Sequence, residues 1–526
     1  MVRWQGHAYL LRGSYHFTKS INLPLVLVHF MISIFPGAGK PAGVLVRVAP
    51  SFLRFGSVQL AAKRQGVEGL IEIGRYALEV IAAMEARDDD SAKYFHGAAV
   101  ADLDEPTKAQ CFFTARSSPS CAANVDSDDD QEVLRCLLER VVERSAALVA
   151  AWTATGFAHG VMNTDNMSLL GISLDLNVYG WMERTDDAFV PNHVDDEARY
   201  AFGKQAEMMR WNLRQLAQAL GGVRYLQDHE ADVGTWADGS SGWLPEAVRK
   251  AELTRFDGVY ERCLGVRRRL RLGLPLPRTA DTDSEAVETV VKGWTRWLKR
   301  SKVDFHRAHR CLADIDIAPL FEAAGDDHDN AEKRQHGHGT AALAALAVAH
   351  QAGGIAPSAM RAAVVELQAW LIDYSAVLRR GFESVGACAD DGKEKESMVE
   401  WRRQMRAVNP VTVLRTAPVR RLTLFAAEQP AESGGVTSGG GESGALQAVW
   451  RMVAEPFNAT ATLAEIDAEA EAGVAEGGSE GGGSVLRREV AVVALGLRKG
   501  AEGGTEEIGH SSRQLLQQQQ TSCGGQ

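Results

Sequence analysis

The sequence predicts an α+β fold, in which a small strand-containing part near the N-terminus precedes a mostly helical remainder. Three observations lead to this prediction. Residues 43–48 form a short run, rich in valine, that is typical of a strand. Two further apolar runs, 168–170 and 172–174, lie on either side of Gly171 as the arms of a tight hairpin would. Beyond residue 200, apolar residues recur mostly at helical spacing.

Length and composition limit the classes of protein to consider. The 526 residues are enough for about two or three domains, and 45% hydrophobic with 24% charged residues permits a core of normal size. The formal net charge of -11 argues against a nucleic-acid binder, which would have a basic face, and against a polybasic membrane contact. The seven cysteines contain no CxxC pair, so we expect reduced thiols in an intracellular protein.

Residues 1–42 differ in composition from the rest of the chain. They contain arginine and lysine but no acidic residue, since the first one is Glu68, and this is typical of an organellar transit peptide. The apolar run 21–35 is too short for an ordinary membrane span. A misassigned first exon and an unusual core strand are the alternatives that remain open. We therefore expect a mitochondrial protein, with the cytoplasm or the plastid as alternative locations.

The rest of the chain divides into three parts. The main core is expected at 43–330, interrupted by an acidic, serine-rich insertion at 87–131 that contains few apolar residues. A helical part is expected at 331–460. A glycine- and glutamine-rich, largely disordered tail is expected at 461–526.

Apolar spacing predicts the helices within these parts. The clearest helix has one apolar face and ends near Gly156; the residues on that face are Leu134, Leu138, Val141, Leu148 and Trp152. Further helices are expected at 70–84, 210–220, 286–312, 340–351 and 362–379.

The helix that ends near Gly156 leads into a polar loop, residues 159–166, and then into the predicted hairpin. Protein kinases place a base and a metal-binding Asn on such a loop, then a second metal-binding Asp after a hairpin. Asp165, Asn166 and Asp175 stand in that order. Mg²⁺ prefers hard oxygen ligands, and a carboxylate can accept a proton from a hydroxyl. An Asx turn that caps a strand is the alternative interpretation of this loop.

The residues around this loop resemble the selenoprotein O (SelO) family of kinase-fold protein adenylyltransferases. The likeness covers roughly residues 43–460, and several ordered blocks are more specific than one short motif. The blocks are RVAPSFLRFG at 47–56, FAHGVMNTDNMS at 157–168, PNHVDDEARY at 191–200 and WNL at 211–213, with weaker ones at 303–305 and 409–415.

The resemblance implies a protein-kinase-like (pseudokinase) fold with a mostly helical C-lobe. It also implies that ATP binds in an orientation reversed relative to kinases, so that AMP moves to a Ser, Thr or Tyr hydroxyl of a protein. By matching position, Asp165 is the general base. Asn166 and Asp175 are the ligands of Mg²⁺, or of Mn²⁺ in its place. Arg47 and Arg54 grip the far phosphate, a role that suits the planar donor fork of a guanidinium group.

The N-terminal part departs from the family pattern. The family's phosphate-binding lobe, with a Gly-rich strand and loop and an ATP-binding Lys, normally precedes the Arg47 block. Only 46 residues precede Arg47 here, and Lys40 completes no P-loop because the GxxxxGK spacing is absent. We therefore expect a truncated N-lobe, caused by a gene-model error or by real degeneration. A catalytically impaired pseudokinase that binds partners and a conventional protein kinase are the resulting alternatives to adenylyl transfer.

Smaller departures concern single positions. Ala198 stands where the family has Gly, and Pro191 stands where some members have Cys, so no thiol switch is available there. Cys523 resembles the family's C-terminal Cys or selenocysteine, or is an exposed Cys in a disordered tail. We expect His159 to have a structural role, bonding to the backbone of the loop.

Overall fold

The structure is a computed structural model of the chain. It describes residues 27–32, 44–87, 129–174, 176, 178–225, 233–235, 243–276, 284–313, 357–384, 391–410 and 413. The described residues fall into two compact units, one within 1–179 and 187–267 and the other within 180–186 and 268–526. They are mostly helical with a few short strands, so the α+β prediction is confirmed.

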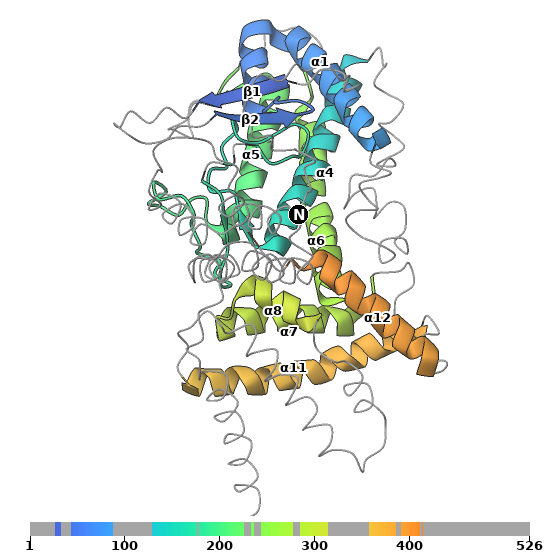
Figure 1. Cartoon of the computed structure of the whole chain (residues 1–526). Helices are drawn as coiled ribbons and strands as arrows, with labels where there is room; N and C mark the ends of the chain where they lie inside the picture. The colour runs from blue at the N-terminus through green and yellow to red at the C-terminus, as the bar shows by residue number, and fades with distance from the viewer. Residues whose placement is uncertain are drawn as a thin grey trace, which may run out of the picture. The chain divides into compact units, whose positions relative to one another are not determined.

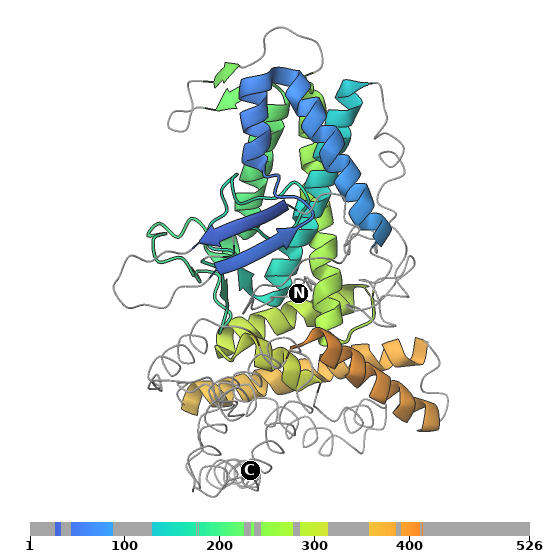
Figure 2. The same ribbon diagram turned by 45° about the horizontal axis from the view of Figure 1, so that its top comes forward.

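The first described elements are two strands. β1 (Leu27–Ile32) pairs antiparallel with β2 (Val44–Ala49), from Leu27 opposite Ala49 to Ile32 opposite Val44, and Figures 1 and 2 show them side by side. The strand predicted at 43–48 is confirmed. A strand also occupies part of the apolar run 21–35, which was one of the interpretations open for it.

Helix α1 (Phe55–Arg87) contains the predicted helix 70–84 and extends beyond it at both ends. It bends at Gly66, where φ is 65° and ψ is -150°, a conformation that glycine adopts readily. The bend is visible in Figure 2. Arg87 therefore belongs to a helix and not to the acidic insertion expected from that residue onward.

Helix α4 (Asp130–Thr155) follows the insertion. The Asp129 carboxylate caps it by accepting hydrogen bonds from the backbone N–H groups of Gln131 and Glu132. It ends at Gly156, as predicted, where a φ of 72° stops the helix. Residues 130–131 therefore belong to α4, and residues 88–128 of the expected insertion lie outside the described residues.

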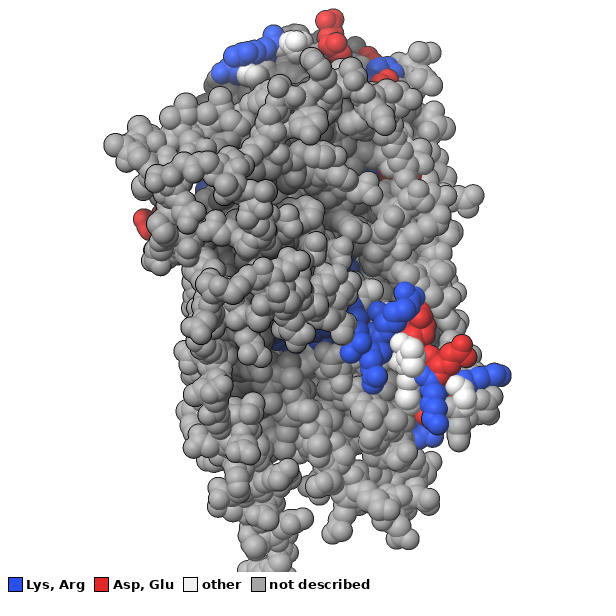
Figure 3. All heavy atoms as spheres, in the orientation of Figure 1, with Lys and Arg blue, Asp and Glu red and all other residues white. Residues whose placement is uncertain are grey.

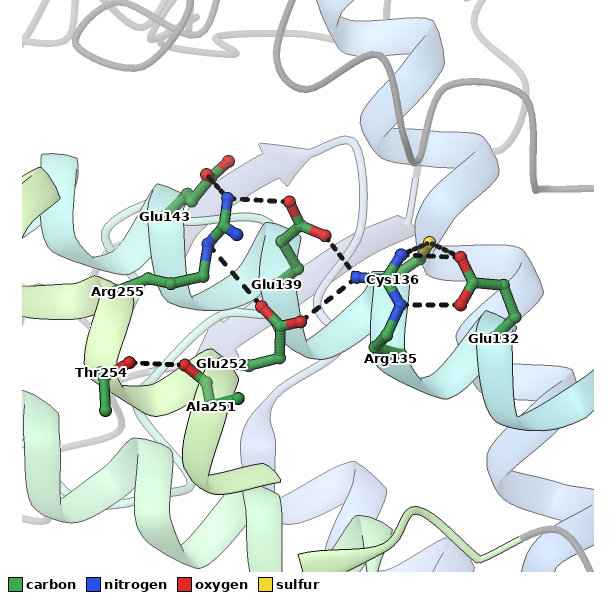
Figure 4. Close-up of polar contacts among 9 residues, drawn as sticks. All are labelled: Glu132, Arg135, Cys136, Glu139, Glu143, Ala251, Glu252, Thr254 and Arg255. Carbon is green, nitrogen blue, oxygen red and sulfur yellow. Dashed lines mark hydrogen bonds and ion pairs between the residues drawn. The ribbon is translucent and has the colours of Figure 1, made fainter. Parts of the chain in front are cut away.

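The prediction of one apolar face on α4 is wrong, because the helix is buried around most of its circumference. Helices α1 and α5 pack against it, and side chains of α6 reach it from another side (Figure 4). Four charged residues are therefore buried on α4 along with the apolar ones; they are Glu139, Arg140, Glu143 and Arg144. Each of them is ion-paired, which offsets the cost of burying charge.

Ion pairs join α4 to α6 (Glu246–Leu272), a helix that the sequence did not predict. The Glu139 carboxylate lies 2.8 Å from Arg135 and 2.9 Å from Arg255. Arg255 also pairs with Glu143 at 2.8 Å, and Arg135 with Glu252 at 3.2 Å. Figure 4 shows the two guanidinium groups alternating with the carboxylates between the two helices.

The remaining elements of the first unit are short strands and one helix. Helix α5 (Gln205–Leu220) confirms the prediction at 210–220 and follows the 3₁₀ turn η1 (Phe202–Lys204). The strands are β3 (Phe157–Ala158), β5 (Val223–Tyr225) and β6 (Val233–Thr235), of which β5 and β6 pair antiparallel.

The second unit contains strand β4 (Gly180–Trp181) and four helices among its described residues. The helix predicted at 286–312 is in fact two, α7 (Ser284–Ser301) and α8 (Phe305–Leu312). The break arises because Lys302 has a φ of 54° and the Asp304 carboxylate caps α8.

The other two helices of this unit are α11 (Pro357–Ser384), which confirms the prediction at 362–379, and α12 (Asp391–Val408), which was not predicted. α11 packs on α7, where Trp370 donates a hydrogen bond to the Val290 carbonyl at 2.8 Å. Asn409, in one of the weaker family blocks, bonds Arg271 through both its amide oxygen and its amide nitrogen. The helix expected at 340–351 lies outside the described residues.

The surface of α12 carries charges of both signs. Figure 3 shows blue and red side chains interspersed there, and Arg403 pairs with Glu400 at 2.7 Å. This helix therefore lacks the continuous basic face that a nucleic acid would need. Among the helices that the structure describes, none is both long enough and apolar enough to cross a bilayer.

Candidate active site

The polar loop predicted to carry chemistry is held against the start of α1. Residues 53–56 run antiparallel to residues 164–169, and Arg54 and Ser168 form the bridge between them. The backbone hydrogen bonds are Leu169 N to Leu53 O at 3.1 Å, Phe55 N to Met167 O at 2.9 Å, and Gly56 N to Thr164 O at 3.1 Å. We call this pairing the loop clamp. It joins two of the family blocks that lie more than a hundred residues apart in the sequence.

Asp165 lies at the exposed edge of the loop clamp. Its Oδ1 atom is beside the first turn of α1, 2.0 Å from the point where a Cβ on Gly56 would lie. Within the described part of the chain, no group donates a hydrogen bond to this carboxylate. The Asx turn that was the alternative interpretation is therefore not formed by Asp165. An exposed carboxylate with this freedom can accept a proton from an incoming hydroxyl.

Asn166 is half-buried and its amide is oriented by the loop itself. Nδ2 donates to the Val161 carbonyl at 3.1 Å, and the backbone N–H donates to the Asn163 carbonyl at 3.0 Å. Oδ1 is therefore directed away from Val161. A neutral oxygen held in this way is the kind of ligand that Mg²⁺ takes from proteins.

The hairpin predicted after the loop is confirmed. Met167 and Ser173 form its antiparallel bridge, and Gly171 makes the turn with a φ of 65°. A Cβ on Gly171 would also lie 3.1 Å from the backbone carbonyl of Arg144. The second arm is fixed from outside, because the Trp152 indole donates to the Ser173 hydroxyl at 2.9 Å. Asp175, two residues further on, lies outside the described residues.

His159 is completely buried and has the structural role expected of it. Its Nε2 atom forms a hydrogen bond with the Leu174 carbonyl at 2.8 Å, and its backbone N–H donates to the Gln205 side chain at 3.0 Å. The residue thus ties the start of the loop to the end of the hairpin and to α5. The chain next to Asp175 is therefore anchored on the loop.

Of the two predicted phosphate-binding arginines, the structure describes the side chain of one. Arg54 is half-buried, and its backbone is paired with Ser168 inside the loop clamp. Arg47 lies in β2 opposite His29 of β1, and its side chain is outside the described residues. The structure therefore brings Arg54 to the loop that carries Asp165 and leaves the place of the Arg47 side chain a prediction.

A buried ion cluster supports the hairpin, and the sequence did not predict it. Glu85 near the end of α1 pairs with Arg140 and, at 3.0 Å, with Arg144. Arg144 also donates from Nε to the Leu170 carbonyl at 2.8 Å. The available signal was the four-residue spacing of the two arginines, which places them on one face of the helix.

A second loop, residues 191–200, is attached to the first. Asn192 donates from Nδ2 to the Gly160 carbonyl at 3.2 Å. The Asp195 carboxylate accepts hydrogen bonds from the backbone N–H groups of Arg199 and Tyr200 at 2.9 and 2.8 Å. Ala198 has a φ of 51°, which is left-handed backbone that glycine adopts at lower cost. This block is therefore held by its own hydrogen bonds and is attached to the polar loop at Gly160.

The comparisons with known proteins all find protein nucleotidyltransferases. A family model described as protein adenylyltransferase SelO matches residues 32–423. A protein nucleotidyltransferase YdiU from Azoarcus sp. (strain BH72) is 31% identical over 283 residues, which are 53% of this chain and 41% of the relative. One from Chromohalobacter salexigens is 26% identical over 420 residues, covering 80% of this chain and 59% of the relative. The chain thus spans about half the length of these curated relatives.

Proposed function

Because the chain belongs to the SelO family of protein adenylyltransferases, we propose that it transfers AMP from ATP to Ser, Thr or Tyr hydroxyls of proteins. The observation that supports this most is the loop clamp, which holds Asp165, Asn166 and the backbone of Arg54 together. The proposal includes a protein-kinase-like arrangement of the core and a mitochondrial location, with the cytoplasm or plastid as alternatives.

In the proposed reaction, the acceptor hydroxyl oxygen attacks the α-phosphorus of ATP. Asp165 accepts the hydroxyl proton as the new P–O bond forms. The bond from the α-phosphorus to the bridging oxygen breaks, and pyrophosphate leaves. The exposed position of Asp165 supports this role, since an acceptor protein can reach it. Arg54 and Arg47 would bind the phosphates that depart, where planar guanidinium groups stabilise the developing charge.

Asn166 and Asp175 would hold Mg²⁺, or Mn²⁺ in its place. The bound ion supplies positive charge to the phosphate oxygens. The orientation of Asn166 supports this assignment, because the bond from Nδ2 to the Val161 carbonyl directs the amide oxygen away from Val161. An oxygen donor set of one amide and one carboxylate suits a hard cation that takes its other ligands from phosphate and water.

Parallel incubations with ATP labelled at the α- or the γ-phosphate test the proposed function. We expect protein labelling from the α-labelled nucleotide and none from the γ-labelled one. Labelling from the γ-position alone would mean conventional phosphoryl transfer. Absence of labelling from both, in a preparation that Mg²⁺-ATP does not stabilise against heat, would contradict the proposal.

A further inference from the structure

We infer that Gly56 is a positioning residue for the general base: its missing side chain leaves the space that the Asp165 carboxylate occupies. The inference rests on the proposed function. A Cβ on Gly56 would lie 2.0 Å from Oδ1 and 3.2 Å from Cγ of Asp165, whereas the Cα of Asp165 is 3.8 Å away. A methyl group at position 56 would thus collide with the carboxylate and not with the backbone.

The loop clamp determines how such a collision is relieved. Gly56 itself donates to the Thr164 carbonyl, and Phe55 donates to the Met167 carbonyl, so the backbone is held on both sides of Asp165. The loop cannot move away without breaking these bonds. The side chain of Asp165 would therefore turn into another staggered rotamer, which carries its carboxylate to a different place.

Backbone conformation does not explain this glycine. Gly160 and Gly171 in the same site have φ values of 84° and 65°, which favour glycine strongly. Gly56 does not have a positive φ and lies in the first turn of α1, where alanine is the better helix former. The space taken by Asp165 is the physical reason that remains for glycine at this position.

Gly56→Ala tests the inference, with Gly258→Ala as the matched control. Gly258 also lies in a helix, α6, and a Cβ there would meet no atom within 4 Å. We expect both variants to melt at or above the wild-type temperature. Gly56→Ala should lower kcat for AMP transfer by about tenfold or more, with KM for ATP within about twofold of wild type. Gly258→Ala should keep the wild-type kcat.

A double-mutant cycle shows whether Gly56 acts through Asp165. In an Asp165→Ala background, Gly56→Ala should cause no further loss of residual activity, because the group it displaces is gone. An additive loss would overturn the inference. So would a wild-type kcat for Gly56→Ala, or a lower melting temperature, since the collision would then involve the backbone.

Crystal structures of the wild type and Gly56→Ala separate this inference from the proposed function. A turned Asp165 side chain in the variant supports the inference about Gly56, whether or not the wild type transfers AMP. Absence of AMP transfer by the wild type would contradict the proposed function alone. An unmoved Asp165 in the variant overturns the inference, whatever activity the wild type has.

Discussion

At the scale of single residues, the site depends on how two neighbouring polar side chains are oriented. Asp165 is exposed and lies against Gly56, while Asn166 is fixed by its bond to Val161. Order and spacing along the chain predicted roles for both side chains, and these roles remain predictions. Order and spacing did not point to Gly56, because its contact with Asp165 forms only when two distant segments pair.

Asp165→Asn tests the role of the base. The amide keeps the size of the side chain but cannot accept the hydroxyl proton, so we expect kcat to fall by roughly 10²–10⁴-fold. KM for ATP should change little, because Asp165 is not assigned to nucleotide binding. Rates of label transfer from α-labelled ATP over a range of ATP concentrations give both values. A variant that keeps the wild-type kcat would exclude Asp165 as the base.

Asn166→Ala tests the metal assignment. ATP should raise the melting temperature of the protein when Mg²⁺ is present. Loss of the amide oxygen should increase, by about tenfold or more, the Mg²⁺ concentration at which half of this rise is reached. Thermal-shift measurements over a range of Mg²⁺ concentrations give this value. Asn166→Asp is the comparison, because it keeps an oxygen ligand but loses the hydrogen bond from Nδ2 to the Val161 carbonyl, and so separates loss of the ligand from loss of this orienting bond. Equal Mg²⁺ requirements in Asn166→Ala and the wild type would contradict the assignment.

At the scale of elements, α4 is the centre of the first unit, and its buried charges make it sensitive to changes on α6. Glu139 is almost completely buried and lies between Arg135 and Arg255 (Figure 4). Apolar spacing predicted where α4 ends but missed α6, whose many charged residues interrupt its apolar pattern. Glu252 and Arg255 of α6 pair with charged residues of α4, and sequence spacing does not show that neighbour.

Arg255→Met tests this ionic connection. The change leaves Glu139 and Glu143 buried with one fewer partner, which should lower the free energy of unfolding by about 1–3 kcal/mol. The value is at the low end because the Arg255 side chain is 39% exposed and solvent screens it. Urea unfolding measures the change. Lys250→Met is the control on the same helix, since its pair with Glu246 is exposed; equal effects of the two changes would contradict the account.

The pH dependence of stability tests the same cluster. Burial, and then the charge of Glu139, raise the pKa of Glu252 above its ordinary value. The folded state therefore binds this proton more tightly than the unfolded state, and the resulting stabilisation is lost as pH rises through the raised pKa. Glu252→Gln cannot lose a proton, so its stability relative to wild type should increase over that pH range. Urea unfolding of both proteins from about pH 4 to pH 7 measures the difference between their free energies of unfolding. A difference that stays constant over this range would contradict the prediction.

At the scale of the whole molecule, the sequence predicted the α+β class and most of the helices that the structure describes. It failed where a local signal was weak or misleading. The break between α7 and α8 depends on Asp304 as a cap and on the left-handed Lys302, and continuous apolar spacing hid both. The family was predicted correctly, because several blocks appear in order along the chain, and the family match covers 32–423.

In the proposed function the loop clamp serves AMP transfer, and the intact mass of an acceptor protein tests this role. After incubation with the wild-type chain, Mg²⁺ and ATP, we predict that the acceptor gains the mass of one AMP group. The Asp165→Asn variant should give no such gain in the same time. An acceptor that gains only the mass of a phosphate, or gains AMP equally with Asp165→Asn, would contradict the account.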